Sequence, residues 1–197
     1  MARYLLYLSK QIKTGSLNMT RPQRLLINQR PHLVYYQSLN QRKAFSSPED
    51  YQQYLQWLQE EAAAYKCILH AYLFLPKQIY LIVEPTYGKD ISKIMQALGR
   101  RYVRYLNLKE KLSGTLWKDR FKSSPLKTDY WLKNAQHYLA YKPVAEGLCK
   151  DPEDYFWSSY KENLVRQPSA LKGFKLAPST NTSTQLEIAL SRNEPLE

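Results

Sequence analysis

Arginine and lysine residues gather in two stretches of this sequence, and their side chains are suited to neutralising phosphate groups. The first stretch covers residues 1–43 and contains no acidic residue; its basic residues are Arg3, Lys10, Lys13, Arg21, Arg24, Arg30, Arg42 and Lys43. The second stretch, from Arg100 to Lys127, holds nine basic residues against only Glu110 and Asp119. Together with a net charge of +12 and a pI near 9.6, this clustering indicates a polyanionic partner, and nucleic acid is the default class.

Aromatic residues are interleaved with the second basic stretch, namely Tyr102, Tyr105, Trp117 and Phe121. Aromatic rings can stack on unpaired bases or form a hydrophobic core, so both interpretations stay open. After Asp90, the basic stripe of the predicted helix carries no acidic residue, which favours phosphate contact over a merely solvated face. The candidate nucleic-acid-binding residues are Lys93, Arg100, Arg101, Arg104, Lys118, Arg120 and Lys122.

The sulfur and imidazole groups form no recognisable metal-binding motif. Cys67 and Cys149 belong to no CxxC or Cys/His cluster, which argues against zinc and against a disulfide scaffold and fits a reducing, cytoplasmic compartment. His32 and His70 lie in predicted strands, where we expect structural roles. The apolar runs are too short for a transmembrane helix or a signal peptide, so we expect no membrane partner.

The helix with the clearest sequence signal begins at Ser47-Pro48. Ser47 is a favourable cap, Pro48 suits the first helical position, and Asp50 has a spacing similar to that of a capping box. Apolar residues then follow at helical spacing as far as Tyr65. Later helices are predicted from Asp90 to about residue 105, from Thr128 to Tyr141 with Pro143 as its stop, and from Asp151 to Tyr160.

Three segments are rich in β-branched and aromatic residues and are predicted strands: 32–39, 67–75 and 78–84. Pro76-Lys77 separates the last two, so these strands form a hairpin. In the returning strand, Ile79, Leu81 and Val83 should face the core, while Gln78 and Tyr80 share the opposite face.

This order of strands and helices predicts an α+β fold, a ferredoxin-like antiparallel sheet with helices packed on it, in a single domain. We expect a basic N-terminal arm over residues 1–30 and the folded domain over residues 31–163. The segment 164–197 is rich in Ser, Thr, Pro and Asn and is expected to be a flexible C-terminal tail.

Four blocks of sequence resemble, in the same order, the REP-associated tyrosine transposases, a branch of the single-tyrosine HUH transposases. The match spans roughly residues 32–162, and the order of the blocks makes it specific. The blocks are HAYLFLPKQIYLIV at 70–83, GRRYVRYLN at 99–107, GTLWKDRFKSS at 114–124, and HYLAYKPVAEGL with DPEDYFWSSY within 137–160.

The resemblance implies that Tyr138 is the candidate nucleophile of a DNA transesterification. In the family, this tyrosine attacks a DNA phosphate, forms a phosphotyrosine link and releases a 3′-hydroxyl. A free tyrosine has a pKa of about 10 and is a poor nucleophile at neutral pH, so a divalent metal normally polarises the phosphate. His137 is adjacent to Tyr138, but neighbouring helical residues point apart.

The family's metal-binding positions carry different residues here. Its two histidines correspond to Gln78 and Tyr80, and the asparagine that completes its metal site corresponds to Lys142, four residues after Tyr138. Glutamine is a neutral oxygen ligand, tyrosine is a poor ligand for magnesium or manganese unless it is ionised, and an ammonium repels a dication. We therefore expect no metal and no other cofactor, with Mg or Mn only if the site is retained in an altered form.

We expect a DNA-binding protein of the single-tyrosine transposase family, which binds hairpin or single-stranded DNA and is impaired in metal-dependent strand cleavage. One alternative is an active transposase that nicks and rejoins single-stranded DNA through Tyr138, with Lys142 in place of the metal as an electrostatic clamp. A second alternative is an RNA-binding or protein-interaction module on the same fold. The expected location is cytoplasmic and nucleoid-associated, and the protein is a monomer or a homodimer.

Overall fold

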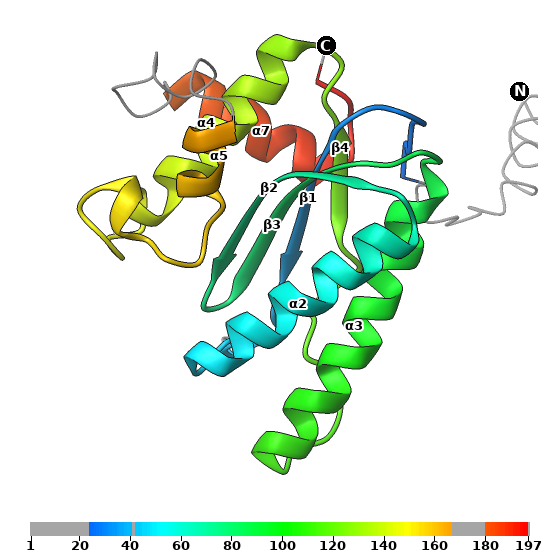
Figure 1. Ribbon diagram of the computed structural model, residues 1–197, viewed down its shortest axis with the longest axis vertical. Coiled ribbons are helices and arrows are strands. Elements are labelled where there is room, and N and C mark those ends of the chain that lie inside the picture. The colour runs from blue at the N-terminus through cyan, green and yellow to red at the C-terminus, as the bar shows by residue number, and fades with distance from the viewer. Residues whose placement is uncertain (1–23, 41, 167–179, 197) are drawn as a thin grey trace, which may run out of the picture.

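The computed structural model describes residues 24–40, 42–166 and 180–196, and its centre is a four-stranded antiparallel sheet in the order β2-β3-β1-β4 (Figure 1). The first six elements alternate as in a split βαβ arrangement, so the predicted ferredoxin-like α+β fold is confirmed. The strands and helices are β1 (His32–Gln37), α2 (Pro48–Ala64), β2 (Ile68–Leu75), β3 (Gln78–Glu84), α3 (Lys89–Glu110), β4 (Lys122–Pro125), α4 (Asp129–Ala145), α5 (Tyr160–Arg166) and α7 (Thr180–Arg192).

Local signals in the sequence account for several element boundaries. Pro48 is the first residue of α2, and the Asp50 carboxylate accepts hydrogen bonds from the backbone N–H groups of Ser46 and Ser47, as the capping pattern predicts. Pro143 does not end α4, which continues to Ala145. Only two helical residues follow Pro143, so the missing N–H affects only the last turn of the helix.

Strand alternation produces a hydrophobic core on each face of the sheet. Ile79, Leu81 and Val83 pack with residues of α2 and α3 on one face, whereas Tyr80 and Ile82 pack with residues of α4 and α7 on the other. The predicted alternation along β3 is therefore confirmed. Figure 1 shows the two pairs of helices on opposite sides of the sheet.

The C-terminal segment differs from the loose tail that its composition predicts. Residues 180–192 form α7, and Leu186, Ala189 and Leu190 are buried against the sheet. The chain then follows β4, where the N–H of Leu196 donates to the carbonyl oxygen of Pro125 over 3.0 Å. Apolar residues at helical spacing, rather than the overall polar composition, fix this segment to the domain.

The folded part of the chain begins before residue 30, which the sequence predicts to be the end of the N-terminal arm. Residues 1–23 lie outside the described chain, but the segment from Arg24 onward contacts the domain. The Arg24 guanidinium lies 3.7 Å from the centre of the Phe121 ring and its Nε donates to the Phe121 carbonyl oxygen over 2.9 Å. The N–H of Gly88 donates to the Asn28 side chain over 2.8 Å. This part of the predicted arm therefore belongs to the folded body.

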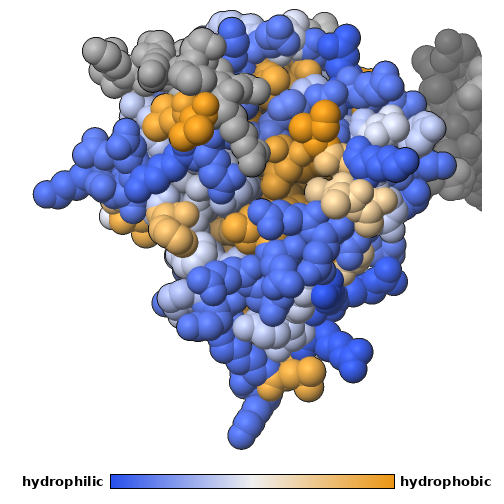
Figure 2. All heavy atoms as spheres, in the orientation of Figure 1, coloured by the Kyte–Doolittle hydropathy of each residue, from blue (hydrophilic) through white to orange (hydrophobic). Residues whose placement is uncertain are grey.

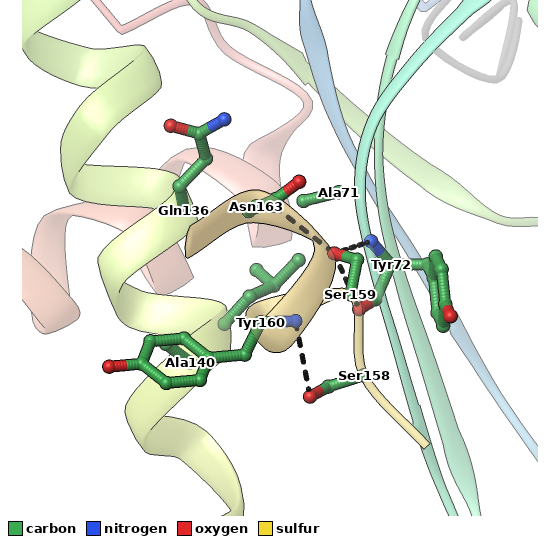
Figure 3. Close-up of a pocket in the computed structure, with 9 residues that line it drawn as sticks. Ala71, Tyr72, Gln136, Ala140, Ser158, Ser159, Tyr160 and Asn163 are labelled. Atoms are coloured by element: carbon green, nitrogen blue, oxygen red, sulfur yellow. Dashed lines mark hydrogen bonds between the residues drawn. The ribbon is translucent and has the colours of Figure 1, made fainter. Parts of the chain in front are cut away.

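The segment after α4 covers the edge of β2 rather than forming the single helix expected over 151–160. A 3₁₀ turn occupies Pro152–Asp154, and α5 starts only at Tyr160. Between them, the Ser159 hydroxyl accepts from the N–H of Tyr72 over 2.9 Å (Figure 3). The cavity at this junction is only about 10 Å³, so it is a packing gap with room for about one water molecule and not a ligand site.

No helix in the described parts of the chain is long and apolar enough to cross a membrane.

Candidate functional site

One open cleft of about 250 Å³ brings together the three positions that the sequence associates with the family's metal site. Gln78 and Tyr80 come from β3 and Lys142 from the end of α4. Lys122, at the start of β4, and Glu187, on α7, line the same cleft. Residues from four elements distant in sequence therefore meet at one place on the α4 face of the sheet.

Gln78 and Tyr80 share a face because they are alternate residues of β3. The Tyr80 hydroxyl donates a hydrogen bond to Oε1 of Gln78 over 3.2 Å. The Tyr80 ring lies between the rings of Tyr35, at 4.9 Å, and Tyr138, at 6.0 Å between centroids. Burial raises the pKa of Tyr80 far above its ordinary value, so this side chain is a neutral phenol at physiological pH.

Tyr138 is held with its ring in the core and its hydroxyl against a carboxylate. Thr128 caps α4 by accepting a hydrogen bond from the N–H of Trp131, and Tyr138 follows near the middle of the helix. Its hydroxyl donates to Oε1 of Glu187 over 2.9 Å. Burial raises the pKa of Tyr138 strongly, and the charge and hydrogen bond of Glu187 raise it further. In this arrangement Tyr138 is a protonated, poor nucleophile.

Lys142 lies one helical turn after Tyr138, on the same side of α4. Its Nζ is 3.4 Å from Oε1 of Glu187 and 3.5 Å from Oε1 of Glu146, and 5.6 Å from the centre of the Tyr138 ring. Sequence reasoning missed both carboxylates. Glu146 has an i,i+4 spacing from Lys142 that could have revealed it, whereas Glu187 lies in a segment that the composition assigns to a tail.

The donor set of this cleft does not fit a divalent cation. It offers an amide oxygen, a neutral phenol that already donates to that oxygen, and an ammonium. The Glu187 carboxylate is engaged by Tyr138 and Lys142. In the described residues, no group of three His, Cys, Asp or Glu side chains is placed to hold a metal ion. Magnesium and manganese favour carboxylate and carbonyl oxygens, and of these the side chains described above offer only the Gln78 amide oxygen, which accepts from Tyr80, and the engaged Glu187 carboxylate.

The three histidines do not replace the missing ligands. His32 is fully buried; its Nε2 accepts from the N–H of Ile27, its Nδ1 lies 2.7 Å from the Arg30 carbonyl oxygen, and burial lowers its pKa. His70 pairs with Glu84 over 2.8 Å. His137 is buried and packs against Tyr141. Their positions agree with structural roles.

The predicted nucleic-acid-binding residues fall into two groups. Arg101 pairs with Glu60 over 2.7 Å and Lys93 with Asp90 over 2.8 Å, so acidic residues do accompany part of the basic stripe. The other five are Arg100, Arg104, Lys118, Arg120 and Lys122, and these have no carboxylate partner among the described residues.

The interleaved aromatic residues mainly belong to the core. Tyr102 is fully buried and Trp117 is 6% exposed, while Phe121 is covered by Arg24. Tyr105 is half-buried and donates to the Asp50 carboxylate over 3.0 Å. Of the two interpretations open from the sequence, core packing is therefore the one that the structure supports.

A solved structure of a known protein shares this fold. The structure of a REP-associated tyrosine transposase bound to a REP hairpin matches with a TM-score of 0.65 and 17% identity, over 82% of this chain and 92% of that one. A crystal structure assigned to a transposase of Deinococcus radiodurans R1 matches with a TM-score of 0.42 and 15% identity, over 70% of this chain and 98% of that one. No curated protein matches the chain. The model of the family described as "Transposase IS200 like" matches residues 27–142, more than half of the sequence, and the chain therefore belongs to the IS200-like transposase family.

Proposed function

We propose that this protein binds hairpin or single-stranded DNA as a member of the REP-associated branch, and that its metal-dependent strand cleavage is impaired. The observation that carries the proposal is the cleft beside Tyr138, where Gln78, Tyr80 and Lys142 replace ligands with groups that do not suit a dication. The solved structure with the same fold holds a REP hairpin, which supports DNA as the partner of this chain.

The basic surface supports binding independently of the cleft. Arg100 and Arg104 are exposed on α3, and Lys118 and Arg120 are exposed just before β4. Figure 2 shows a largely hydrophilic surface over α2 and α3. Exposed cations without carboxylate partners displace the counterions condensed on the phosphates of a nucleic acid, and the release of these counterions favours association.

A competition experiment tests the binding proposal. Labelled hairpin DNA is bound to the full chain, and binding is followed by fluorescence anisotropy at several salt concentrations. Unlabelled hairpin DNA should displace the labelled hairpin far better than the RNA hairpin of the same sequence, heparin or random duplex DNA. Equal displacement by all polyanions would refute specific DNA binding, and preferential displacement by the RNA would favour the RNA-binding alternative instead.

A second candidate, an active nuclease that does not depend on metal, is favoured by one observation. Lys122 and Lys142 line the same cleft as Gln78 and Tyr80, so two ammonium groups could hold a phosphate close to Tyr138. For attack, the Tyr138 oxygen bonds to phosphorus and the phenol proton passes to Glu187, while the bond from phosphorus to the 3′ oxygen breaks and that oxygen leaves as a hydroxyl with a proton from the Lys122 ammonium. This candidate predicts nicking that survives EDTA and disappears in Tyr138→Phe; loss of nicking in EDTA would refute it.

A further inference from the structure

Three cavities adjoin one another and share lining residues. The cleft beside Tyr138 shares Tyr35 and Lys122 with a cavity of about 50 Å³. That cavity shares Tyr36 and Arg120 with a third, of about 360 Å³, which extends to Arg24 and to α3. We call these three cavities together the edge groove.

The edge groove exists because the chain leaves the sheet just before β4. Lys122 pairs with Tyr35, and the N–H of Lys118 donates to the Gln37 carbonyl oxygen over 3.0 Å. The β1–β4 ladder begins only at Lys122, so residues 119–121 lie outside it. Tyr35 and Tyr36 point to opposite faces because they are consecutive in a strand. The groove therefore connects the α3 face of the sheet with the α4 face around the β4 edge.

The charge along the edge groove is mostly positive. Asp119 and Glu187 are its only carboxylate side chains among the described lining residues. The basic residues along it are Arg24, Lys93, Lys118, Arg120, Lys122 and Lys142. A row of cations in a narrow groove is suited to following a phosphate backbone.

Two tyrosine rings line the groove where it crosses the edge. Tyr36 stacks on Trp117 with centroids 4.1 Å apart, and Tyr35 lies against Tyr80, so both rings are held in position. Both side chains are half-buried, and burial raises the pKa of each to about 12, so neither carries a negative charge that would repel phosphate. Rings fixed in this way are stacking platforms for unpaired bases.

We propose that the edge groove carries a single-stranded DNA segment around the β4 edge, from the α3 face to the cleft beside Tyr138. The inference rests on the proposed DNA-binding function and adds the path of the strand. Gln96 lines the groove on α3, and Arg100 and Arg104 follow it at four-residue spacing on the same side of the helix. When a hairpin stem lies on the row formed by Gln96, Arg100 and Arg104, the single strand next to the stem enters the edge groove.

The test compares a blunt hairpin with the same hairpin carrying a single-stranded extension of about ten nucleotides. In the wild-type chain, the extension tightens binding and steepens the salt dependence. The groove variant K118Q/R120Q/K122Q removes three charges and should bind the extended hairpin no more tightly than it binds the blunt hairpin, so the increment is lost whatever the affinity for the blunt hairpin. The salt slope for the extended DNA should flatten by about 2, at roughly 0.7 for each single-strand phosphate contact. The matched control K133Q/K150Q/K161Q removes three exposed charges outside the groove and should keep the increment.

A second measurement is independent of variant folding. Halogenated pyrimidines in the extension are photo-crosslinked to the wild-type chain, and the attached peptides are mapped by mass spectrometry. Crosslinks at Tyr35, Tyr36 or residues 118–122 support the path, whereas crosslinks confined to other segments overturn it. An increment retained by the groove variant also overturns it. Failure of the wild-type chain to bind even the blunt hairpin would refute the proposed function itself.

Discussion

Replacing Arg100 and Arg104 together with alanine separates phosphate contact from mere surface charge on α3. Both side chains are exposed, and neither has a carboxylate partner among the described residues. Arg101 is their neighbour in sequence, but it pairs with Glu60 over 2.7 Å and lies 4.2 Å from the centre of the Trp57 ring. Arg101→Ala is therefore a matched control from the same helix.

The expected magnitude follows from counterion release. Each phosphate contact on duplex DNA contributes about 0.9 to the slope of log K against log salt, so the double variant should flatten the slope by about 1.8. At about 0.15 M salt, this corresponds to roughly 30-fold weaker binding, or about 2 kcal/mol. Arg101→Ala should change the slope by much less, because its charge is already engaged by Glu60.

The assay is fluorescence anisotropy with a labelled hairpin between about 50 and about 200 mM salt, the range over which the slope is well determined. Thermal unfolding of each variant controls for loss of structure. An unchanged slope in the double variant would remove this row of α3 from the interface. A larger effect from Arg101 than from the other two would show that the ion pair with Glu60 does not decide which cations contact DNA.

Three further predictions test the cleft, the C-terminal helix and a buried histidine. The variant Q78H/Y80H/K142N, which restores the family's ligands, should bind Mn²⁺ in titration calorimetry, whereas the wild type should not. Equal binding by both proteins would refute the assignment of these three positions to the family's metal site. Leu186→Ala should lower the free energy of unfolding by about 2–4 kcal/mol because Leu186 is fully buried, whereas Ile188→Ala, at an exposed position of the same helix, should change it little. Equal small losses for both variants in urea unfolding would mean that α7 is a loose tail. Burial lowers the pKa of His32 from 6.5, so the folded state binds a proton at His32 less readily than the unfolded state, and the free energy of unfolding should decline as the pH falls below about 6.5. His32→Gln should reduce this decline, measured by urea unfolding at about pH 7 and about pH 5. An unchanged decline would contradict the assignment.

Strands β1, β2 and β3 were predictable because alternation and turn residues are local signals, whereas the four-residue strand β4 was not among the predicted strands. Gln78 and Tyr80 were placed on one face from the sequence, and the cleft then brings them to Lys142. The resemblance supplied Lys142 as a partner for this site, since no local pattern links α4 to β3.

The remaining features depend on contacts distant in sequence. The partner of Arg101 is Glu60, on another helix, so the charge pattern of α3 alone could not reveal it. The burial of Tyr102 and Trp117 could not be distinguished from base stacking, because the same apolar ring serves both purposes. The helical spacing of Leu186, Ala189 and Leu190 was a signal for α7, but it is short and surrounded by polar residues.

The most direct test of the account is a covalent-adduct assay with hairpin-bearing single-stranded DNA. The full chain is incubated with labelled DNA in manganese and, separately, in EDTA, beside Tyr138→Phe, and each sample is run on native and denaturing gels. The account predicts a native-gel complex for both proteins and no denaturation-resistant band in either condition. A manganese-dependent band lost in Tyr138→Phe would contradict it, because it would show that the cleft of Gln78, Tyr80 and Lys142 supports metal-dependent cleavage.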